Sequence, residues 1–328
     1  MSKVSVIGAG NVGATAAMKI AKDNYVNEIV LLDIKDGVAE GKAMDIMQCA
    51  LSEEFSTNVI GVTNDYSATA NSDVIIVTSG MARKPGMTRE DLVGVNSRIM
   101  GSVIGECDKY SPDACYVIVS NPMDTMTMQA LNILRKLHPN QIMDGCVIGM
   151  GNLLDSSRFR YFIWKAIMHK NPILVNSMND IINTFVIGGH GDKTMIPVVE
   201  DVLVHTPWGK NVSLTKVLSK EEIDDVVDNT MKGGSILTNL LGTSAWEAPG
   251  ACIAMTVDAL LRRNRNAIPC SVYSEEYGCC IGTMVGLGKP YDHYGIVAKF
   301  VEERPELVEK LKMTAEAIKE VNKAIPEI

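Results

Sequence analysis

The sequence has no long apolar run and no excess of positive charge. Apolar segments such as Ile29–Leu32 and Val74–Val77 fall far short of the ~20 residues that a membrane-spanning helix needs. Strand-like sequence follows Lys3 directly, so we expect no signal peptide. Lys and Arg number 31 against 39 Asp and Glu, a net charge of −8, which excludes a general attraction for nucleic acid. We therefore expect a soluble cytoplasmic protein with neither membrane nor nucleic acid as its partner.

The chain also lacks the cysteine patterns of metal and redox sites. Its 8 cysteines include no C-x-x-C pair, and no cysteine and histidine stand at zinc-finger spacing, so we expect no metal site. Most lie in apolar runs, where a free cysteine behaves as a small core residue. The adjacent Cys279 and Cys280 also fit a buried strand, and whether they respond to oxidants stays open.

Short apolar runs alternate with helical spacing through the first half. A chain of 328 residues is typical of two domains, and strand–helix alternation is typical of a doubly wound parallel sheet. We predict an α/β protein with a doubly wound domain over residues 1–148 and a second, mixed α/β domain over 149–328. The strands that we expect in the first half are Lys3–Ile7, Glu28–Leu32, Asn58–Val62, Asp73–Val77, Cys115–Val119 and Cys146–Ile148, and the helices are Asn11–Lys22, Val38–Leu51 and Glu90–Lys109. A further helix is expected to follow Asn121-Pro122.

The second half has fewer regular signals. Ser219-Lys220-Glu221-Glu222 is typical of a helix start, and a helix is expected to begin near Leu153. The remaining expectations are strands at Asn183–Ile187, Ile268–Tyr273 and Cys280–Val285, and helices at Ala245–Leu261 and from Pro305 to about Ala324.

A glycine-rich turn follows the first strand. Gly8, Gly10 and Gly13 form a G-x-G-x-x-G pattern before a helix, and Asp33 ends the second strand. Gly8 allows the turn, Gly10 lets the backbone approach a pyrophosphate and Gly13 permits close helix–strand packing, while the helix N-terminus attracts phosphate. Asp33 can accept hydrogen bonds from a ribose diol and repels a 2′-phosphate, which favours NAD over NADP. The alternative is a glycine-rich turn with an incidental surface Asp.

Three further segments carry polar residues suited to catalysis. Arg83 and Arg89 lie in a loop after the fourth strand, and Asp155 and Arg158 share a helix face. His190 lies between Gly189 and Gly191, and glycine on both sides lets the backbone turn sharply and present the imidazole. Taken singly, these are also typical of a solvated loop, a structural ion pair and a loop histidine without a role. Together they supply what oxidation of a 2-hydroxy acid needs: a base, a carboxylate to orient it, a guanidinium for the substrate carboxylate and a second cation for the carbonyl oxygen.

On these motifs the chain resembles the lactate/malate dehydrogenase superfamily, in its lactate-dehydrogenase-like malate dehydrogenase branch. The resemblance runs nearly end to end and implies a Rossmann domain, NAD as cofactor and a homo-oligomer, dimer or tetramer, formed through the helix that contains Gly41–Asp45. The segments that carry it are GAGNVG, VLLD, TSGMARKPGMTRED, VSNPMD, VIGMGNLLDSSRFR, GGHGD and LGTSAWEAPGA.

The resemblance also implies a role for individual residues. His190 is expected to be the proton acceptor and Asp155 its partner, while Arg158 binds the C1 carboxylate and Arg89 polarises the carbonyl. Asn121 is expected to contact both substrate and nicotinamide. The residues expected to contact NAD are Gly8, Gly10, Asn11, Val12, Gly13, Asp33, Asn96, Val119 and Asn121.

Arg83 occupies the position that distinguishes substrates in this family. Malate and oxaloacetate carry a second carboxylate that requires a cation, whereas lactate and pyruvate carry a methyl group. We therefore expect malate/oxaloacetate as substrate. A lactate or other 2-hydroxyacid dehydrogenase on the same scaffold is one alternative, and a catalytically silent NAD-binding sensor is another. The other four histidines, His138, His169, His205 and His293, are interpreted as surface or interface residues.

Overall fold

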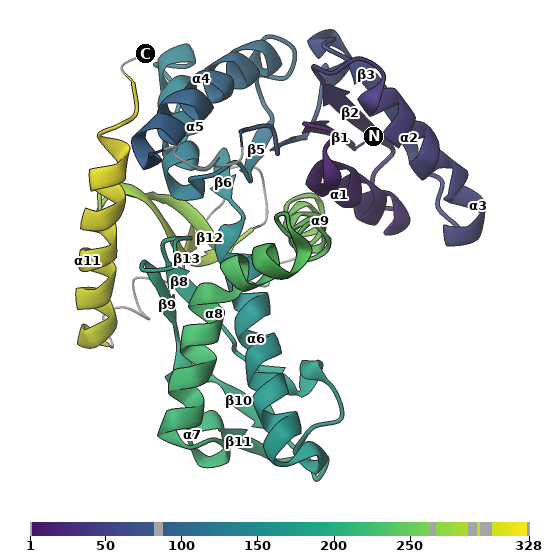
Figure 1. Ribbon diagram of the computed structural model, residues 1–328. Helices are drawn as coiled ribbons and strands as arrows, with labels where there is room; N and C mark the ends of the chain where they lie inside the picture. The colour runs from purple at the N-terminus through teal and green to yellow at the C-terminus, as the bar shows by residue number, and fades with distance from the viewer. Residues whose placement is uncertain (1, 82–87, 263–266, 288–293, 296–303, 327–328) are drawn as a thin grey trace.

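A computed structural model describes residues 2–81, 88–262, 267–287, 294–295 and 304–326. Its main sheet contains 11 strands (Figure 1). Six parallel strands from the first half lie in the order β3-β2-β1-β4-β5-β6, the order of a Rossmann domain. They are β1 Lys3–Ile7, β2 Glu28–Asp33, β3 Asn58–Thr63, β4 Val74–Val77, β5 Cys115–Ile118 and β6 Val147–Gly149. The predicted α/β class is confirmed.

Helices cover both faces of this sheet, which explains why its strands are continuous runs of Val, Ile and Leu. Val4 and Val6 of β1 join one buried cluster with α1, α2 and α9, and Ile7 joins a second with α4 and α5. The bounds are α1 Asn11–Lys22, α2 Val38–Gln48, α3 Ala50–Glu53, η1 Tyr66–Thr69, α4 Arg89–Asp108, α5 Met123–Leu137 and α9 Glu247–Leu261.

The second half extends the same sheet with antiparallel strands. Ser271 of β12 pairs with Gly149 of β6, and the order continues through β13, β8 and β9, with β14 also on β13. Helix α11, Pro305–Asn322, packs over β13 and β8. The strands are β8 Val186–Gly188, β9 Met195–Pro197, β12 Ala267–Ser274, β13 Cys279–Gly286 and β14 Tyr294–Gly295. Because the sheet runs across the predicted boundary at residue 148, that division stays a prediction.

Helices α6 and α8 extend away from this sheet and carry a small second sheet at their far end (Figure 1). Their core contains Phe159 and Ile163 of α6 with Val226 of α8. The elements are α6 Gly151–Lys170, η2 Pro172–Leu174, η3 Met178–Asp180, β7 Ile181–Ile182, η4 Val199–Asp201, β10 Leu203–His205, β11 Asn211–Ser213, α7 Leu214–Val217 and α8 Lys220–Leu241. None of the helices in the described ranges combines the length and hydropathy needed to cross a membrane.

Two local predictions were wrong. The strand expected at Asn183–Ile187 begins only at Val186, because Asn183 has a left-handed φ of 59° that interrupts an extended strand. The helix expected over Val38–Leu51 ends at Gln48, and α3 follows as a separate short helix. The strands β7, β9, β10 and β11 were not predicted, since two or three residues are too few to show a periodicity.

Candidate active site

The glycine turn between β1 and α1 has one crowded end and one open position. A Cβ atom on Gly13 would lie 2.0 Å from the Gly8 carbonyl oxygen, and Gly8 itself has a φ of +108°. A Cβ on Gly10 would meet no atom within 4 Å. Gly10 also caps α1 without any side-chain hydrogen bond, so the N–H groups of the first helical turn remain available. This combination fits a pyrophosphate at the start of α1.

Asp33, at the end of β2, is fixed beside this turn. One carboxylate oxygen accepts the Ala9 backbone N–H at 2.8 Å, and the other accepts the Lys35 N–H at 2.9 Å. Each oxygen keeps a second lone pair, which fits a ribose diol. Asn11 and Val12 form the first turn of α1, with Asn11 exposed and Val12 half-buried. The residues at this edge therefore fit the dinucleotide that the sequence predicts.

Asn96 connects two segments at the carboxyl ends of the central strands. Its side-chain oxygen accepts the Met81 N–H at 2.8 Å, and its amide donates to the carbonyls of Met81 at 3.1 Å and Asn121 at 2.6 Å. Only 1% of Asn96 is exposed. Val119 follows β5, and its N–H donates to Val77. The contacts of Asn96 and Val119 with NAD stay predictions. The side chain of Asn96 also has a structural role, because it joins the backbone at Met81 to that at Asn121.

His190, Asp155 and Arg158 meet although they come from two elements. His190 Nδ1 lies 2.7 Å from one oxygen of Asp155, and Arg158 Nη1 donates to the other at 3.0 Å. Asp155 is fully buried, whereas the His190 and Arg158 side chains are each 14% exposed. An ionised carboxylate can only accept hydrogen bonds, so Nδ1 carries the proton and Nε2 is left as the acceptor in neutral His190.

The same carboxylate controls the protonation of His190. Burial by itself lowers the pKa of the imidazole, but the negative charge of Asp155 and its hydrogen bond raise this pKa by more, so it lies above the ordinary histidine value. The positive charge of Arg158 opposes this rise, and the negative charge of Asp124 adds to it. His190 is therefore a base whose charged form is stabilised, as a proton acceptor requires.

Asp124 is a second buried carboxylate at this site, and it was not among the residues predicted to take part. Its oxygens accept the His190 backbone N–H at 2.8 Å and the Ser271 hydroxyl at 2.7 Å. Burial raises its pKa, although these two hydrogen bonds lower it in part. The only sequence signal was a carboxylate in the first turn of the helix after Asn121-Pro122, within the VSNPMD segment.

Small residues make room for both functional side chains. A Cβ on Gly151, at the start of α6, would lie 2.4 Å from His190 Cγ. A Cβ on Gly233 of α8 would lie 3.1 Å from Arg158 Cδ. The glycines beside His190 were predicted to shape its turn, but these two, distant in sequence, were not. Figure 1 shows α6 and α8 side by side, which accounts for the second contact.

A cavity of about 520 Å³ opens beside these residues. It is lined by Asn121, Asp124 and His190 on one side and by Ile318 and Val321 of α11 on another. Of the remaining predicted residues, Arg83 lies outside the described residues. Arg89 is the first residue of α4, where Thr88 and Asp91 form a capping box.

His138 is half-buried and has a partner: its side chain is 15% exposed and its Nε2 lies 2.7 Å from Asp108. Its place at the surface or in an interface stays a prediction. The partner is 30 residues away in sequence, so no local carboxylate signalled it. His169 and His205 are exposed as expected, and His293 lies outside the described residues.

Comparison with known proteins follows the two halves of the chain. Residues 2–144 match the family model for the lactate/malate dehydrogenase NAD binding domain, and residues 153–327 match that for the lactate/malate dehydrogenase alpha/beta C-terminal domain. Two proteins named malate dehydrogenase, from Parabacteroides distasonis and Bacteroides thetaiotaomicron, are each 48% identical to this chain, over 332 and 334 residues respectively. Each comparison covers 100% of this chain and 99% of the relative.

Solved structures give the same result for the fold. Malate dehydrogenase from Salinibacter ruber superposes with a TM-score of 0.85 at 33% identity, covering 98% of this chain and 97% of that one. A lactate dehydrogenase from Cryptosporidium parvum, solved with lactic acid and NAD, gives a TM-score of 0.84 at 30% identity, covering 99% and 98%.

Proposed function

The chain belongs to the lactate/malate dehydrogenase family, and we propose that it is an NAD-dependent malate dehydrogenase that interconverts malate and oxaloacetate. One observation carries the chemistry: His190 Nδ1 lies 2.7 Å from the buried Asp155, which also holds Arg158. Gly8, Gly10, Gly13 and Asp33 would hold NAD, which would accept the hydrogen on the malate hydroxyl carbon as a hydride, with both electrons of the C–H bond.

His190 acts on the hydroxyl group. In malate oxidation, Nε2 of the neutral imidazole takes the hydroxyl proton, and the Asp155 carboxylate stabilises the imidazolium that forms. In oxaloacetate reduction the imidazolium returns this proton to the carbonyl oxygen. The raised pKa of His190 favours the protonated form that reduction requires.

Arg158 is suited to hold the C1 carboxylate of the substrate. It spends one Nη1 N–H on Asp155, and a guanidinium carries five N–H donors in all. Asp155 therefore fixes Arg158 and His190 with a single carboxylate and so sets the distance between the substrate carboxylate and hydroxyl. Asn121 is assigned a hydrogen bond to substrate and a place beside the nicotinamide, and Arg89 the polarisation of the carbonyl.

Arg83 is assigned the second carboxylate of malate. Leaving this carboxylate unpaired in the closed site costs about 2–5 kcal/mol, which corresponds to roughly 30-fold to several thousand-fold in rate preference. With pyruvate the same arginine has no partner, so it also disfavours the wrong substrate.

The test compares NADH oxidation with oxaloacetate and with pyruvate at matched concentrations, in the wild-type enzyme and in Arg83→Gln. We expect a strong preference for oxaloacetate that Arg83→Gln removes in large part. A wild-type preference for pyruvate contradicts the substrate and supports a lactate-type enzyme on the same scaffold. No rate with either substrate leaves only the NAD-binding domain established.

We also propose a homo-oligomer. Apolar side chains are exposed on α2, α3 and α9, where Met44 is 64%, Leu51 91% and Met255 51% exposed. These helices flank α1, and burying such side chains favours association. We expect Met44→Glu to lower the mass measured by light scattering. Ile173→Glu, at a position that is 65% exposed on η2, is the matched control, and an equal effect of both contradicts the assignment.

For location we propose the cytoplasm. All 8 cysteines are free and 7 of them are buried, which is typical of proteins from reducing compartments. Fractionation of the source cells tests this, and enrichment outside the cytoplasm contradicts it.

A further inference from the structure

Two consecutive glycines stand directly before His190. Gly188 ends β8 with a φ of +83°, in the left-handed region, and Gly189 follows it. Glycine has more backbone conformations open to it than any other residue. The place of the His190 imidazole therefore depends on contacts that fix this glycine pair from neighbouring elements.

Asn152 supplies one such contact from α6. Its Nδ2 donates to the Gly188 carbonyl at 3.0 Å, and the residue is fully buried. Gly282 of β13, which pairs with Gly188, leaves room for the amide, because a Cβ there would lie 2.0 Å from Nδ2. The amide is thus enclosed between α6 and two glycines of the main sheet.

Stability does not account for an asparagine at this position. Oδ1 of Asn152 is buried and has no hydrogen-bond partner in the parts of the chain that the structure describes. A buried acceptor without a donor costs free energy, and an apolar side chain would avoid this cost. What the amide provides instead is the bond to Gly188. Residues that break a rule of packing in this way are expected at functional sites.

The same helix also holds the ring of His190. Asp155 lies three residues after Asn152, and residues at this spacing share a helix face. One oxygen of Asp155 lies 2.7 Å from His190 Nδ1. Helix α6 therefore holds this segment at two points, the backbone two residues before His190 and the imidazole itself. A change in the first bond alters the distance in the second.

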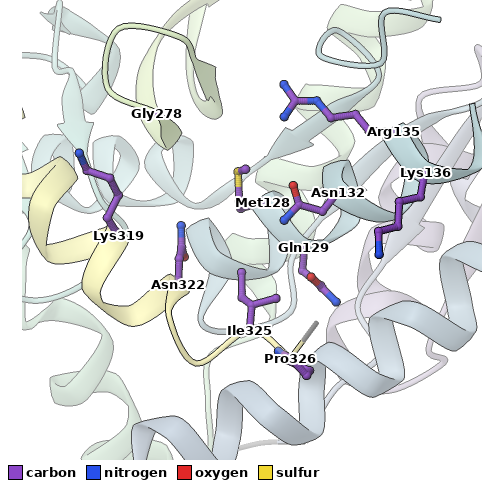
Figure 2. A pocket seen from close by; sticks show the side chains of 10 residues that line it. All are labelled: Met128, Gln129, Asn132, Arg135, Lys136, Gly278, Lys319, Asn322, Ile325 and Pro326. Atoms are coloured by element: carbon purple, nitrogen blue, oxygen red, sulfur yellow. The ribbon is translucent and has the colours of Figure 1, made fainter. Parts of the chain in front are cut away.

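The N–H of His190 is held from another helix. Asp124 of α5 accepts it at 2.8 Å and also accepts the Ser271 hydroxyl of β12. Arg135, in the last turn of α5 (Figure 2), lies 4.3 Å from the centroid of the Tyr273 ring on the same strand. Helix α5 contacts β12 near both of its ends and gives the His190 backbone a fixed point that does not depend on α6.

We propose that Asn152 is a positioning residue for His190. By fixing the Gly188 carbonyl, it keeps Nδ1 of the imidazole at hydrogen-bond distance from Asp155 and so sets the direction of Nε2. Asn152 acts only through His190, since it is fully buried. This role rests on the proposed function, in which Nε2 exchanges a proton with the substrate oxygen.

The test compares Asn152→Ala with the wild-type enzyme in oxaloacetate reduction. We expect kcat to fall by about tenfold, as a small misplacement of a reacting group does, with little change in KM, because Arg158 keeps its bond to Asp155. The alkaline limb of the kcat profile should move to lower pH, since a longer bond to Asp155 raises the pKa of His190 by less. Asn152→Val, which fills more of the space, is the second variant and serves if the first does not fold.

Ser156→Ala is the matched control. Ser156 is also a buried residue of α6, and its hydroxyl accepts the Val186 N–H at 2.9 Å, at the end of β8 that is farther from His190. This variant also removes one bond between α6 and β8, so it should lower Tm without moving the alkaline limb. An equal shift in Ser156→Ala and Asn152→Ala overturns the proposal. So does an unchanged profile in a folded Asn152 variant.

NMR titration of the histidine rings gives a readout that does not depend on catalysis. The His190 signal is the one that His190→Asn lacks, and its pKa should be lower in Asn152→Ala than in the wild type. Among the described residues, the charged groups that act on this ring are Asp155, Arg158 and Asp124, and the variant keeps all three. An unchanged pKa overturns the positioning role. A lowered pKa in a protein that does not reduce oxaloacetate supports the positioning of His190 and contradicts the proposed function.

Discussion

The glycine turn (Gly8–Gly13) and the His190 cluster (His190, Asp155 and Arg158) position their functional groups in opposite ways. In the turn, the absence of a side chain at the glycines is what matters. The space next to Gly10 is open, with no atom within 4 Å of a Cβ placed there, whereas Gly13 has no room for a Cβ. In the cluster, side chains fix one another, since Asp155 bonds to both His190 and Arg158. The glycines that define the turn lie within six residues of the chain, whereas the cluster needs α6 and the loop after β8 to be placed within tenths of an ångström. A cofactor turn can therefore be recognised from a short sequence, and a catalytic cluster much less so.

The largest expected effect is a loss of catalytic rate without a loss of NADH affinity, which would show that the His190 cluster and the glycine turn act independently. We expect His190→Asn to lower the rate of oxaloacetate reduction by about 10²–10⁴-fold, because it removes the proton donor. The Kd for NADH should stay the same, since His190 bonds to Asp155 and Asp124 and to no residue of the glycine turn. Steady-state kinetics and NADH fluorescence titration measure the two quantities. A parallel loss of NADH affinity would show that the regions are not independent.

Within the turn, the crowded and the open glycine should respond differently. We expect Gly10→Ala to raise the Kd for NADH by about tenfold, with little change in Tm, because its methyl group occupies the space where the pyrophosphate approaches. Gly13→Ala should instead lower stability by about 1–3 kcal/mol, since its Cβ meets the Gly8 carbonyl. Thermal unfolding and NADH titration distinguish them. Equal losses of Tm in the two variants would contradict this, because they would mean that a side chain at Gly10 also disturbs the packing of the folded chain.

Within the cluster, Asp155→Asn should move the pH profile. The charge and hydrogen bond of Asp155 raise the pKa of His190, so their loss lowers this pKa. Oxaloacetate reduction needs protonated His190, and its rate falls as pH rises through this pKa. The alkaline limb should therefore shift to lower pH.

The free energy of unfolding should also depend on pH through the pair of His190 and Asp155. The wild-type ion pair stabilises the fold below the unfolded-state pKa of histidine and is lost as pH rises through the higher folded-state pKa. Asp155→Asn should lose this contribution at acidic pH. Asp228→Asn, an exposed carboxylate paired with Lys232, is the control and should leave the profile unchanged.

The smallest effect is expected for Asp124→Asn. Asp124 also raises the pKa of His190, but it bonds to the backbone N–H and not to the ring. An asparagine oxygen can accept that N–H while its amide donates to Ser271. The alkaline limb should therefore shift in the same direction as in Asp155→Asn, by less, with little change in Tm. A shift as large as that of Asp155→Asn would make Asp124 an equal partner of the imidazole.

The fold was predictable where the pattern was long and local. The bounds of β1 and α1 agree with prediction, because a buried strand and a twelve-residue helix each repeat their pattern several times. The strand expected from Asn183 was misplaced, since a single left-handed residue leaves no periodic trace. The pairing of His138 was not predicted for a related reason, as its partner Asp108 belongs to another helix.

The sequence by itself determined the α/β alternation and the glycine pattern of the turn, because both are patterns of residues that are close together in the chain. Only the tertiary structure decided that Asp155 lies against His190 across 35 residues, and that Asp124 joins His190 across 66 residues and Ser271 across 147. A hydrogen bond tolerates an error of only a few tenths of an ångström. Such accuracy comes from the packing of β6, β12 and β13 with the helices around them.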